Sequence, residues 1–498
     1  MNERHYIMKK FSILALLLFT CLFSFAQVTT ENFDCSTIIV GKDASATGHV
    51  MIGHNEDDGG EQVVNFYKMA GSRNHDSKLV LKNGAVINQP RELYGFIWME
   101  MPGQDFADCF LNENGVLVAS NSCPSKERYG EIVDGGIGYN LRKIIAERAE
   151  SARHGVELAG EMISSIGYSA SGRTYTIADP GEAWMLSAVR GKHWVAMKVP
   201  DNEVVYLPNY YIIKNIDFDD TGRFLCSEGL KEYAITRGWY DPSDGEFNFR
   251  EVYGNTRSAA SMSNIGRMWI GVNKLSGSNY DIEADFPVSF IPPEPVEMED
   301  VIAVLGNHYE GTGLDDSNHY RNHNPHKNKA MSICAGHQQM SFVAELRHDM
   351  PVETGCRLWI APRRGCVNAY FPVYYGIKEF PDGWKYFSDN SLVYDSHFNT
   401  PEGMYDRDNG KVWWEFVKVT EFIDDDYSGR IDERREFRDE LQQYLFKKTA
   451  EFDAGLNAAG ADTGNKDTGD VLSEFSRDIL SDYLEKNREY ARSAGISF

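Results

Sequence analysis

Short runs of apolar and β-branched residues, each closed by glycine, proline or aspartate, recur along this chain and predict β-strands. The first run, CSTIIV from Cys35, is followed by a glycine-containing turn and by a second run that ends in the polar letters HNED. Together the two runs predict a β-hairpin that begins with a cysteine. Further strands are predicted at 115–120, 174–177, 183–187 and 193–198, and between 340 and 375.

Apolar residues at helical spacing predict helices at 139–151, 156–166, 257–275 and 293–305. The last of these opens with acidic residues, which suit a helix N-terminus. The charged segment 428–493 is also predicted to be helical, with an exposed loop rich in Gly, Ala and Asp at 454–470. Strands and helices do not alternate as they do in a doubly wound sheet. The predicted fold class is therefore α+β, with layered sheets and helices.

The N-terminal residues have the pattern of an export signal. The first ten residues carry positive charge, and an apolar run at 11–25 ends in the small-x-small sequence Ser24-Phe25-Ala26. This run is shorter than the roughly 20 apolar residues that a membrane-spanning helix needs. The sequence therefore predicts a cleaved signal peptide at 1–26, a secreted or periplasmic protein, and no stable membrane insertion after cleavage.

The charge balance narrows the class of partner. Acidic residues outnumber basic ones by 74 to 50, which gives the 498-residue chain a formal charge of −24. Such a surface repels phosphate backbones, so nucleic acid is not an expected partner.

The cysteines and histidines do not form a familiar metal-binding pattern. Of eight cysteines, seven remain after the signal peptide, and the six besides Cys35 can either form disulfides or stay as buried thiols. Because their spacing contains no CxxC pair, a structural zinc site is not expected. His319, His323 and His326 would share one face of a helix, but Asn324-Pro325 predicts a loop there. The sequence thus predicts neither a metal site nor a cofactor.

Cys35 lies a few residues past the expected signal cleavage site, where processing of the chain can make it the N-terminal residue. If processing ends at Asp34, Cys35 carries a free α-amino group with a pKa of about 8. One residue then supplies both a thiol nucleophile and a general base, which can later protonate a leaving amine. An ordinary buried or disulfide-bonded cysteine is the alternative interpretation.

Five stretches carry a resemblance to a known family: 35–57 (CSTIIVGKDASATGHVMIGHNED), 112–121 (NENGVLVASN), 177–200 (IADPGEAWMLSAVRGKHWVAMKVP), 300–312 (DVIAVLGNHYEGT) and 345–362 (ELRHDMPVETGCRLWIAP). They resemble the dipeptidase family of cysteine N-terminal-nucleophile (Ntn) hydrolases, relatives of bile salt hydrolase and penicillin V acylase. The resemblance implies a four-layer αββα sandwich that hydrolyses amide bonds through an acyl-cysteine. It implies a short propeptide at 27–34 and a catalytic domain at 35–427, and it leaves a C-terminal helical extension at 428–498.

The same resemblance implies roles for individual residues. Cys35 matches the nucleophile, and Asp57 lies where the family places an aspartate that contacts the N-terminal amine. Asn209 resembles, and Asn121 lies near, an asparagine that donates to the oxyanion, and Arg267 resembles an arginine that closes the site. The alternative interpretations are turn residues at strand ends for the two asparagines and an exposed helix residue for Arg267.

The HNED cluster supplies the predicted substrate-binding residues His54, Asn55 and Glu56. His54 replaces an arginine that the family usually has at this position. The expected fixed cation beside the thiol is therefore missing from this cluster, although a protonated histidine would partly replace it.

Three functional classes follow. The favoured one is a secreted dipeptidase that removes its own propeptide at Asp34-Cys35 and binds short peptides by their free amino terminus. Enzymes of this kind often assemble as homo-oligomers, but the sequence does not determine the oligomeric state. The second is an Ntn acylase acting on N-acyl amides such as conjugated bile acids or penicillin V. The third is a secreted binding protein without enzymatic activity, in which Cys35 is oxidised or stays inside the chain.

Overall fold

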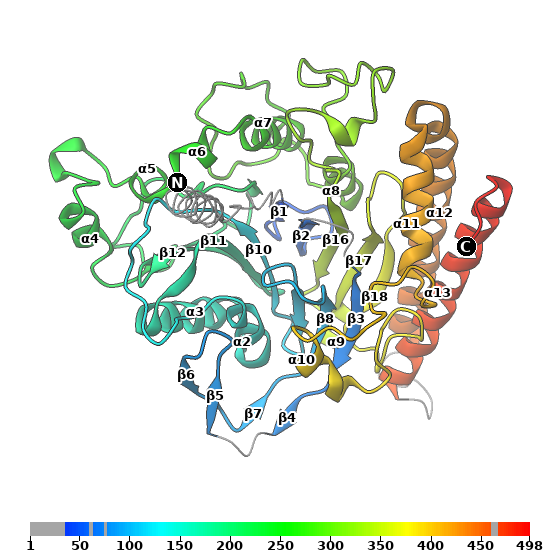
Figure 1. Ribbon diagram of the computed structural model, residues 1–498, viewed down its shortest axis with the longest axis horizontal. Helices are drawn as coiled ribbons and strands as arrows, with labels where there is room; N and C mark the ends of the chain where they lie inside the picture. Colours follow the sequence, from blue (N-terminus) through cyan, green and yellow to red (C-terminus); the bar gives the residue numbers. More distant parts are fainter. Residues whose placement is uncertain (1–34, 59–62, 74–76, 460–466) are drawn as a thin grey trace, which may run out of the picture. The chain divides into compact units, whose positions relative to one another are not determined.

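The structure is a computed structural model that describes residues 35–58, 63–73, 77–459 and 467–498. The predicted signal peptide and propeptide lie outside the described residues. Two antiparallel sheets form the centre of the described fold, and helices lie around them (Figure 1). The predicted mixture of sheets and helices, α+β, is confirmed.

The smaller sheet contains the predicted hairpin. Its strands run in the spatial order β14 (Val204–Leu207), β1 (Ser36–Val40), β2 (Val50–Asp57), β16 (Gln338–Leu346), β17 (Cys356–Pro362) and β18 (Phe371–Tyr374). In the hairpin, Ser36 pairs with Asn55 and Val40 with Met51. This register brings the start of β1 beside the end of β2.

The larger sheet contains the strands predicted at 115–120, 174–177, 183–187 and 193–198. Its order is β15 (Phe224–Cys226), β13 (Trp194–Lys198), β12 (Ala183–Gly191), β11 (Tyr168–Ala178), β10 (Leu117–Ser122), β9 (Cys109–Asn112), β8 (Phe96–Glu100) and β3 (Asn65–Met69). β11 and β12 are longer than their apolar runs indicate, because both continue through polar residues that still pair across the ladder.

Alternate residues of the larger sheet enter different cores. Ile97 and Met99 of β8 pack in one core with residues of the smaller sheet. Trp98 between them packs in a second core with two helices, α2 (Asn140–Arg148) and α3 (Ala152–Ile166). Neighbouring residues of a strand point to opposite faces, so one face of this sheet belongs to each core.

The helices α7 (Met262–Ser276) and α8 (Met298–Leu305) contact β14 and β2 of the smaller sheet. Gly53 of β2 permits this packing, because a Cβ at that position would lie 2.4 Å from a side-chain methyl of Val301. The helix predicted at 293–305 begins only at Met298, since prolines at 292, 293 and 295 prevent helical hydrogen bonding before it. The helix predicted at 257–275 is divided into α6 (Thr256–Ala259) and α7 by the extended backbone of Ser261.

Three C-terminal helices, α11 (Trp413–Asp425), α12 (Tyr427–Ala459) and α13 (Thr468–Ser493), complete the described fold. Leu445 and Tyr483 from α12 and α13 are buried in the same core as the sheets, and the Tyr483 hydroxyl donates to the Ala369 carbonyl at 2.9 Å. The loop predicted at 454–470 is helical at both ends; residues 460–466 lie outside the described residues. Every described helix is too short or too polar to cross a bilayer.

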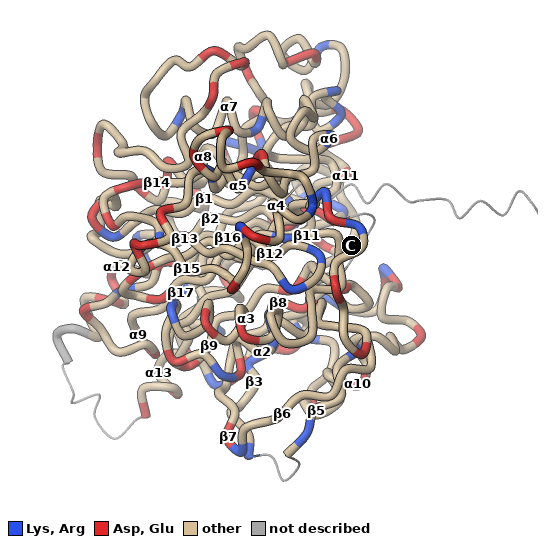
Figure 2. Tube along the Cα trace, turned by 90° about the vertical axis from the view of Figure 1, so that its left-hand side faces the viewer, with Lys and Arg blue, Asp and Glu red and all other residues tan. Residues whose placement is uncertain are grey.

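The remaining short elements lie between these units. They are β4 (Ser72–Arg73), β5 (Lys78–Val80), β6 (Val86–Asn88), β7 (Glu92–Leu93), α4 (Leu230–Thr236), α5 (Phe249–Tyr253), α9 (Val352–Gly355) and α10 (Val393–Ser396), with single 3₁₀ turns at Pro242–Asp244, Pro325–Lys327 and Asn390–Leu392. The charged residues are found mainly in peripheral loops and helices, while the central strands are largely uncharged (Figure 2).

Candidate active site

Cys35 directly precedes β1, and its thiol lies against the end of β2. The Sγ atom is 3.3 Å from Oε1 of Glu56 and 3.8 Å from the main-chain oxygen of Asp57. Both partners belong to the HNED cluster, which the hairpin register brings to this point. The local sequence pattern thus accounts for the contact between Cys35 and the HNED cluster, because a hairpin places its first residues beside its last.

The surroundings of Cys35 keep its thiol protonated. Burial raises the pKa of the Cys35 thiol well above its ordinary value, and the negative charges of Glu56 and Asp57 raise it further. The positive charge of Arg173 lowers it, but by less. A thiol in this environment becomes a nucleophile only when a base removes its proton.

Asn121 reaches Cys35 from the other sheet. Its Nδ2 donates to the main-chain carbonyls of Cys35 and Leu207, each at 3.0 Å, and its Oδ1 accepts from Thr37 Oγ1 at 2.6 Å. An amide nitrogen has two protons, and both are engaged here. In this geometry Asn121 positions the main chain of Cys35 and has no donor left for a reacting carbonyl.

Arg267 forms a second contact to Cys35 and links it to Asn209. The Nη1 atom of Arg267 donates to the Cys35 carbonyl at 3.0 Å, and its Nη2 donates to Oδ1 of Asn209 at 3.0 Å and of Asn264 at 2.7 Å. Nδ2 of Asn209 is buried and has no hydrogen-bond partner within the described ranges. Because its Oδ1 is held by the arginine, this nitrogen is fixed in place with an available donor.

The three predicted substrate-binding residues differ in what they contact. Nδ2 of Asn55 donates to the carbonyls of Leu305 and Ile333, and its Oδ1 accepts from Gln338 and Ser341, so its amide has no hydrogen-bonding capacity left for a substrate.

His54 and Glu56 lie in a continuous chain of contacts that ends at the thiol. His54 Nδ1 is 2.8 Å from Thr37 Oγ1, and its Nε2 is 3.1 Å from Oε2 of Glu56. The potential ligand atoms of Cys35, His54 and Glu56 lie within 4.8 Å of one another. The Glu56 carboxylate contacts both the Cys35 sulfur and the His54 ring, which accounts for that proximity.

Arg173 is a functional candidate that the sequence interpretation missed. It is buried in β11, its Nη1 donates to Ser120 Oγ at 3.2 Å, and its guanidinium lies 4.4 Å from the ring centroid of Phe106. The cation expected in the HNED cluster is thus supplied by a strand of the other sheet. An arginine inside the strand sequence RTYTIA was the available signal, because a buried charge in a strand rarely lacks a partner.

The chain matches the sequence profile of Peptidase family C69 over residues 34–440. The chain belongs to this family. The resemblance on which the residue roles rest is therefore confirmed, and the matched region extends into α12, past the predicted domain boundary at residue 427.

Full-length relatives of this peptidase family carry dipeptidase names. A probable dipeptidase from Latilactobacillus sakei is 24% identical over 487 residues, 92% of this chain and 96% of the relative. A probable dipeptidase A from Streptococcus pyogenes serotype M18 is 26% identical over 481 residues, 91% of this chain and 93% of the relative. Among solved structures, a conjugated bile acid hydrolase from Clostridium perfringens covers 68% of this chain and 92% of its own at 12% identity, with a TM-score of 0.34.

Proposed function

We propose that this peptidase is a secreted cysteine dipeptidase whose nucleophile, Cys35, becomes the N-terminal residue when residues 1–34 are removed. Membership of Peptidase family C69 and the dipeptidase names of its relatives support the substrate class. The observation that carries the proposal is the fixation of Cys35, because its carbonyl accepts from both Asn121 and Arg267 while its thiol lies beside two carboxylates. The sheets and their covering helices form, in this proposal, the four-layer αββα sandwich of Ntn hydrolases.

The reaction begins with proton transfer from the thiol to the α-amino group of Cys35, which acts as the general base. The sulfur then forms a bond to the peptide carbonyl carbon, and the carbonyl electrons move to oxygen. The available Nδ2 donor of Asn209 stabilises this oxyanion. When the C–N bond breaks, the α-ammonium group protonates the leaving amine, and an acyl-cysteine remains.

Water completes the cycle. The α-amino group removes a proton from water, the hydroxide attacks the acyl-cysteine carbonyl, and the thiol leaves with its proton restored. Arg267 and Asn121 hold the Cys35 carbonyl, and with it the amine and the thiol, in one geometry through both steps.

Substrate selection follows from charge. Glu56 and Asp57 place negative charge beside the thiol, and a dipeptide brings a positively charged amino terminus to the same point. A peptide with a blocked amino terminus loses this attraction, whereas an acylase would not require it.

The test is intact-mass measurement and N-terminal sequencing of the secreted protein, for wild type, Cys35→Ala and the control Cys226→Ser. We expect wild type and the control to begin at Cys35 and to hydrolyse dipeptides, and Cys35→Ala to keep residues 27–34 and to be inactive. A mature, active wild-type protein that begins at Gln27 would refute the mechanism. Faster cleavage of N-acetylated dipeptides, penicillin V or a glycine-conjugated bile acid than of free dipeptides would assign the acylase activity instead.

A further inference from the structure

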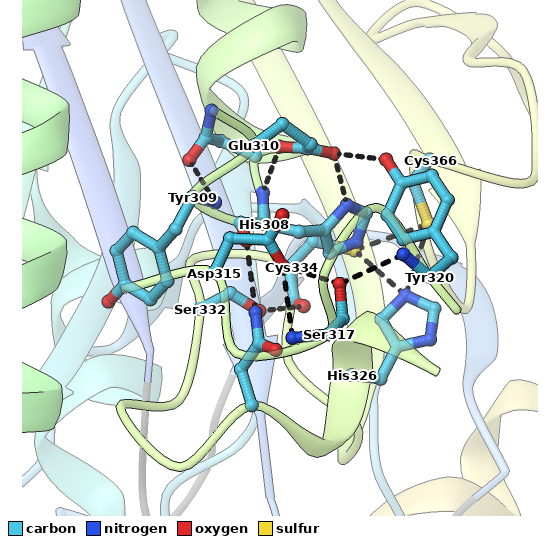
Figure 3. A network of polar contacts seen from close by, with 12 residues as sticks. His308, Tyr309, Glu310, Asp315, Ser317, Tyr320, His326, Ser332, Cys334 and Cys366 are labelled. Carbon is cyan, nitrogen blue, oxygen red and sulfur yellow. Dashed lines mark hydrogen bonds and ion pairs between the residues drawn. The ribbon is translucent and has the colours of Figure 1, made fainter. Parts of the chain in front are cut away.

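Four side chains with metal-binding atoms, none of them part of the candidate active site, meet in a buried cluster (Figure 3). They are His308, His326, Cys334 and Cys366, and their potential ligand atoms all lie within 4.8 Å of one another. The first three come from the long connection between α8 and β16, and Cys366 comes from the turn between β17 and β18. We call these four residues the Cys₂His₂ cluster.

The distances in the cluster fit the edges of a tetrahedron around one ion. Sγ of Cys334 is 3.4 Å from Sγ of Cys366, and Nε2 of His326 is 3.3 Å from the Cys366 sulfur and 3.8 Å from the Cys334 sulfur. A tetrahedral zinc ion with Zn–S bonds of about 2.3 Å and Zn–N bonds of about 2.0 Å separates its ligand atoms by roughly 3.3–3.8 Å. The protein atoms are thus spaced as zinc ligands are.

The fourth ligand atom, Nε2 of His308, completes the set. This nitrogen is buried and finds no oxygen or nitrogen partner among the described residues. Its neighbour is the sulfur of Cys366, and the ring centroids of His308 and His326 lie 4.8 Å apart. Both imidazoles therefore present Nε2 to the same point as the two sulfur atoms.

Carboxylates hold both imidazoles from behind. Oε1 of Glu310 lies 2.9 Å from Nδ1 of His308, and Oδ1 of Asp424 lies 3.0 Å from Nδ1 of His326. A carboxylate that accepts a proton from Nδ1 leaves the lone pair on Nε2, where a metal binds. Arg364 pairs with Asp424 and donates to the Gly336 carbonyl at 2.7 Å, which fixes the carboxylate in turn.

We propose that the Cys₂His₂ cluster binds one zinc ion and is a structural metal site. Four protein ligands fill the tetrahedron and leave no open position for a substrate, as in structural zinc sites. Two thiolates balance the charge of a divalent ion, so the buried centre is neutral. Thiolate and imidazole ligands in tetrahedral arrangement favour zinc over magnesium or calcium.

The site ties together parts of the fold that are far apart in sequence. It joins the loop before β16 to the turn after β17, and through Asp424 it reaches α11. The residue before Cys334, Ile333, accepts the hydrogen bond from Asn55 in the HNED cluster at 2.9 Å. Zinc therefore fixes the loop that supports the active-site end of β2.

A pocket of about 480 Å³ lies beside the cluster, and its lining includes Cys366, Glu310 and Arg435. Glu310 is the residue whose carboxylate contacts Nδ1 of His308.

The experiment measures metal in the full-length secreted protein, purified without chelators and dialysed against metal-free buffer. Elemental analysis is expected to give about one zinc per chain for wild type, and at most about a tenth of that for Cys366→Ser and His308→Ala. The matched controls are Cys226→Ser, outside the cluster, and His323→Ala, in the same loop; both are expected to keep the zinc. Protein loaded with Co²⁺ is expected to show a thiolate-to-metal charge-transfer band that Cys366→Ser lacks.

Measurements on wild type decide the proposal even if a variant fails to fold. A wild-type protein that neither contains zinc nor takes it up from added zinc chloride overturns it. So does a Cys334–Cys366 disulfide, seen as an intact mass lower by two hydrogens and reversed by dithiothreitol. Metal content is independent of dipeptide hydrolysis, so this proposal and the proposed function can fail separately.

Discussion

The guanidinium of Arg267 donates a hydrogen bond of 3.0 Å to the main-chain carbonyl of Cys35, a residue 232 positions away in the sequence. The same guanidinium holds Oδ1 of Asn209. One buried arginine therefore fixes both Cys35, the proposed nucleophile, and the amide of Asn209, the proposed oxyanion donor.

Arg267→Lys tests this double contact. An ammonium group cannot reach the Cys35 carbonyl and Asn209 together, so we expect kcat/KM for a dipeptide to fall at least about 100-fold. Steady-state kinetics on protein of verified N-terminus measures the effect. Arg257→Lys, exposed on α6, is the matched control, and equal rates for the two variants would contradict the assigned role.

Asn209→Ala removes the available donor. Loss of one oxyanion donor lowers kcat by about 10²–10³-fold and leaves KM nearly unchanged, because the interaction forms only in the transition state. Initial rates across substrate concentration separate the two constants, with the exposed Asn215→Ala as control. A change in KM alone would show that Asn209 binds the ground-state substrate.

Two variants that each remove one charge are expected to shift the pKa of the Cys35 thiol in opposite directions. Arg173→Met removes the charge that lowers the pKa of this thiol, and Glu56→Gln removes one that raises it. The pH profile of iodoacetamide alkylation at Cys35, followed by peptide mass spectrometry, should move to higher pH in the first variant and to lower pH in the second. Arg73→Met and Glu92→Gln, an exposed pair 3.0 Å apart, should leave the profile in place.

Lys68 makes stability depend on pH in the alkaline range. Burial lowers the pKa of this lysine to about 7, and its Nζ lies 3.1 Å from the ring centroid of Tyr375. Between pH 7 and about 10 the unfolded chain binds the extra proton, so the unfolding free energy rises with pH, by at most about 1.4 kcal/mol per unit from this group.

Lys68→Met is expected to flatten this rise. Urea unfolding at pH 7, 8 and 9 measures it, with Lys447→Met on α12 as the exposed control. An identical slope in Lys68→Met and wild type would show that another group carries the dependence.

Tyr483 tests whether the C-terminal helices are part of the core. It is 1% exposed and donates to the Ala369 carbonyl. Tyr483→Ala is expected to lower the unfolding free energy by about 3–5 kcal/mol through the cavity it leaves, and Tyr483→Phe by about 1 kcal/mol through the lost hydrogen bond. Tyr129→Ala, 83% exposed, should change stability little, and denaturant unfolding compares all three.

The predicted hairpin at Cys35, the strands and most of the helices agree with the structure because periodicity is a local property of the chain. The predicted ends of helices were less accurate where prolines or glycines lie beside a helical pattern. The three prolines before Met298 delay α8, and the Gly- and Ala-rich segment after Asp453 continues as helix to Ala459 because α12 is already formed there.

By itself, the sequence determined the family, the nucleophile candidate and the partners of Cys35 within the hairpin, since these depend on short motifs and on neighbouring strands. Only the tertiary structure decided that both Asn121 protons are engaged, that Arg173 supplies the cation, and that Cys334 and Cys366 meet two histidines. These contacts join segments that are far apart in the sequence, and no motif fixes the number of residues between them. The packing of distant helices and strands brings these residues together, and local sequence patterns do not predict that packing.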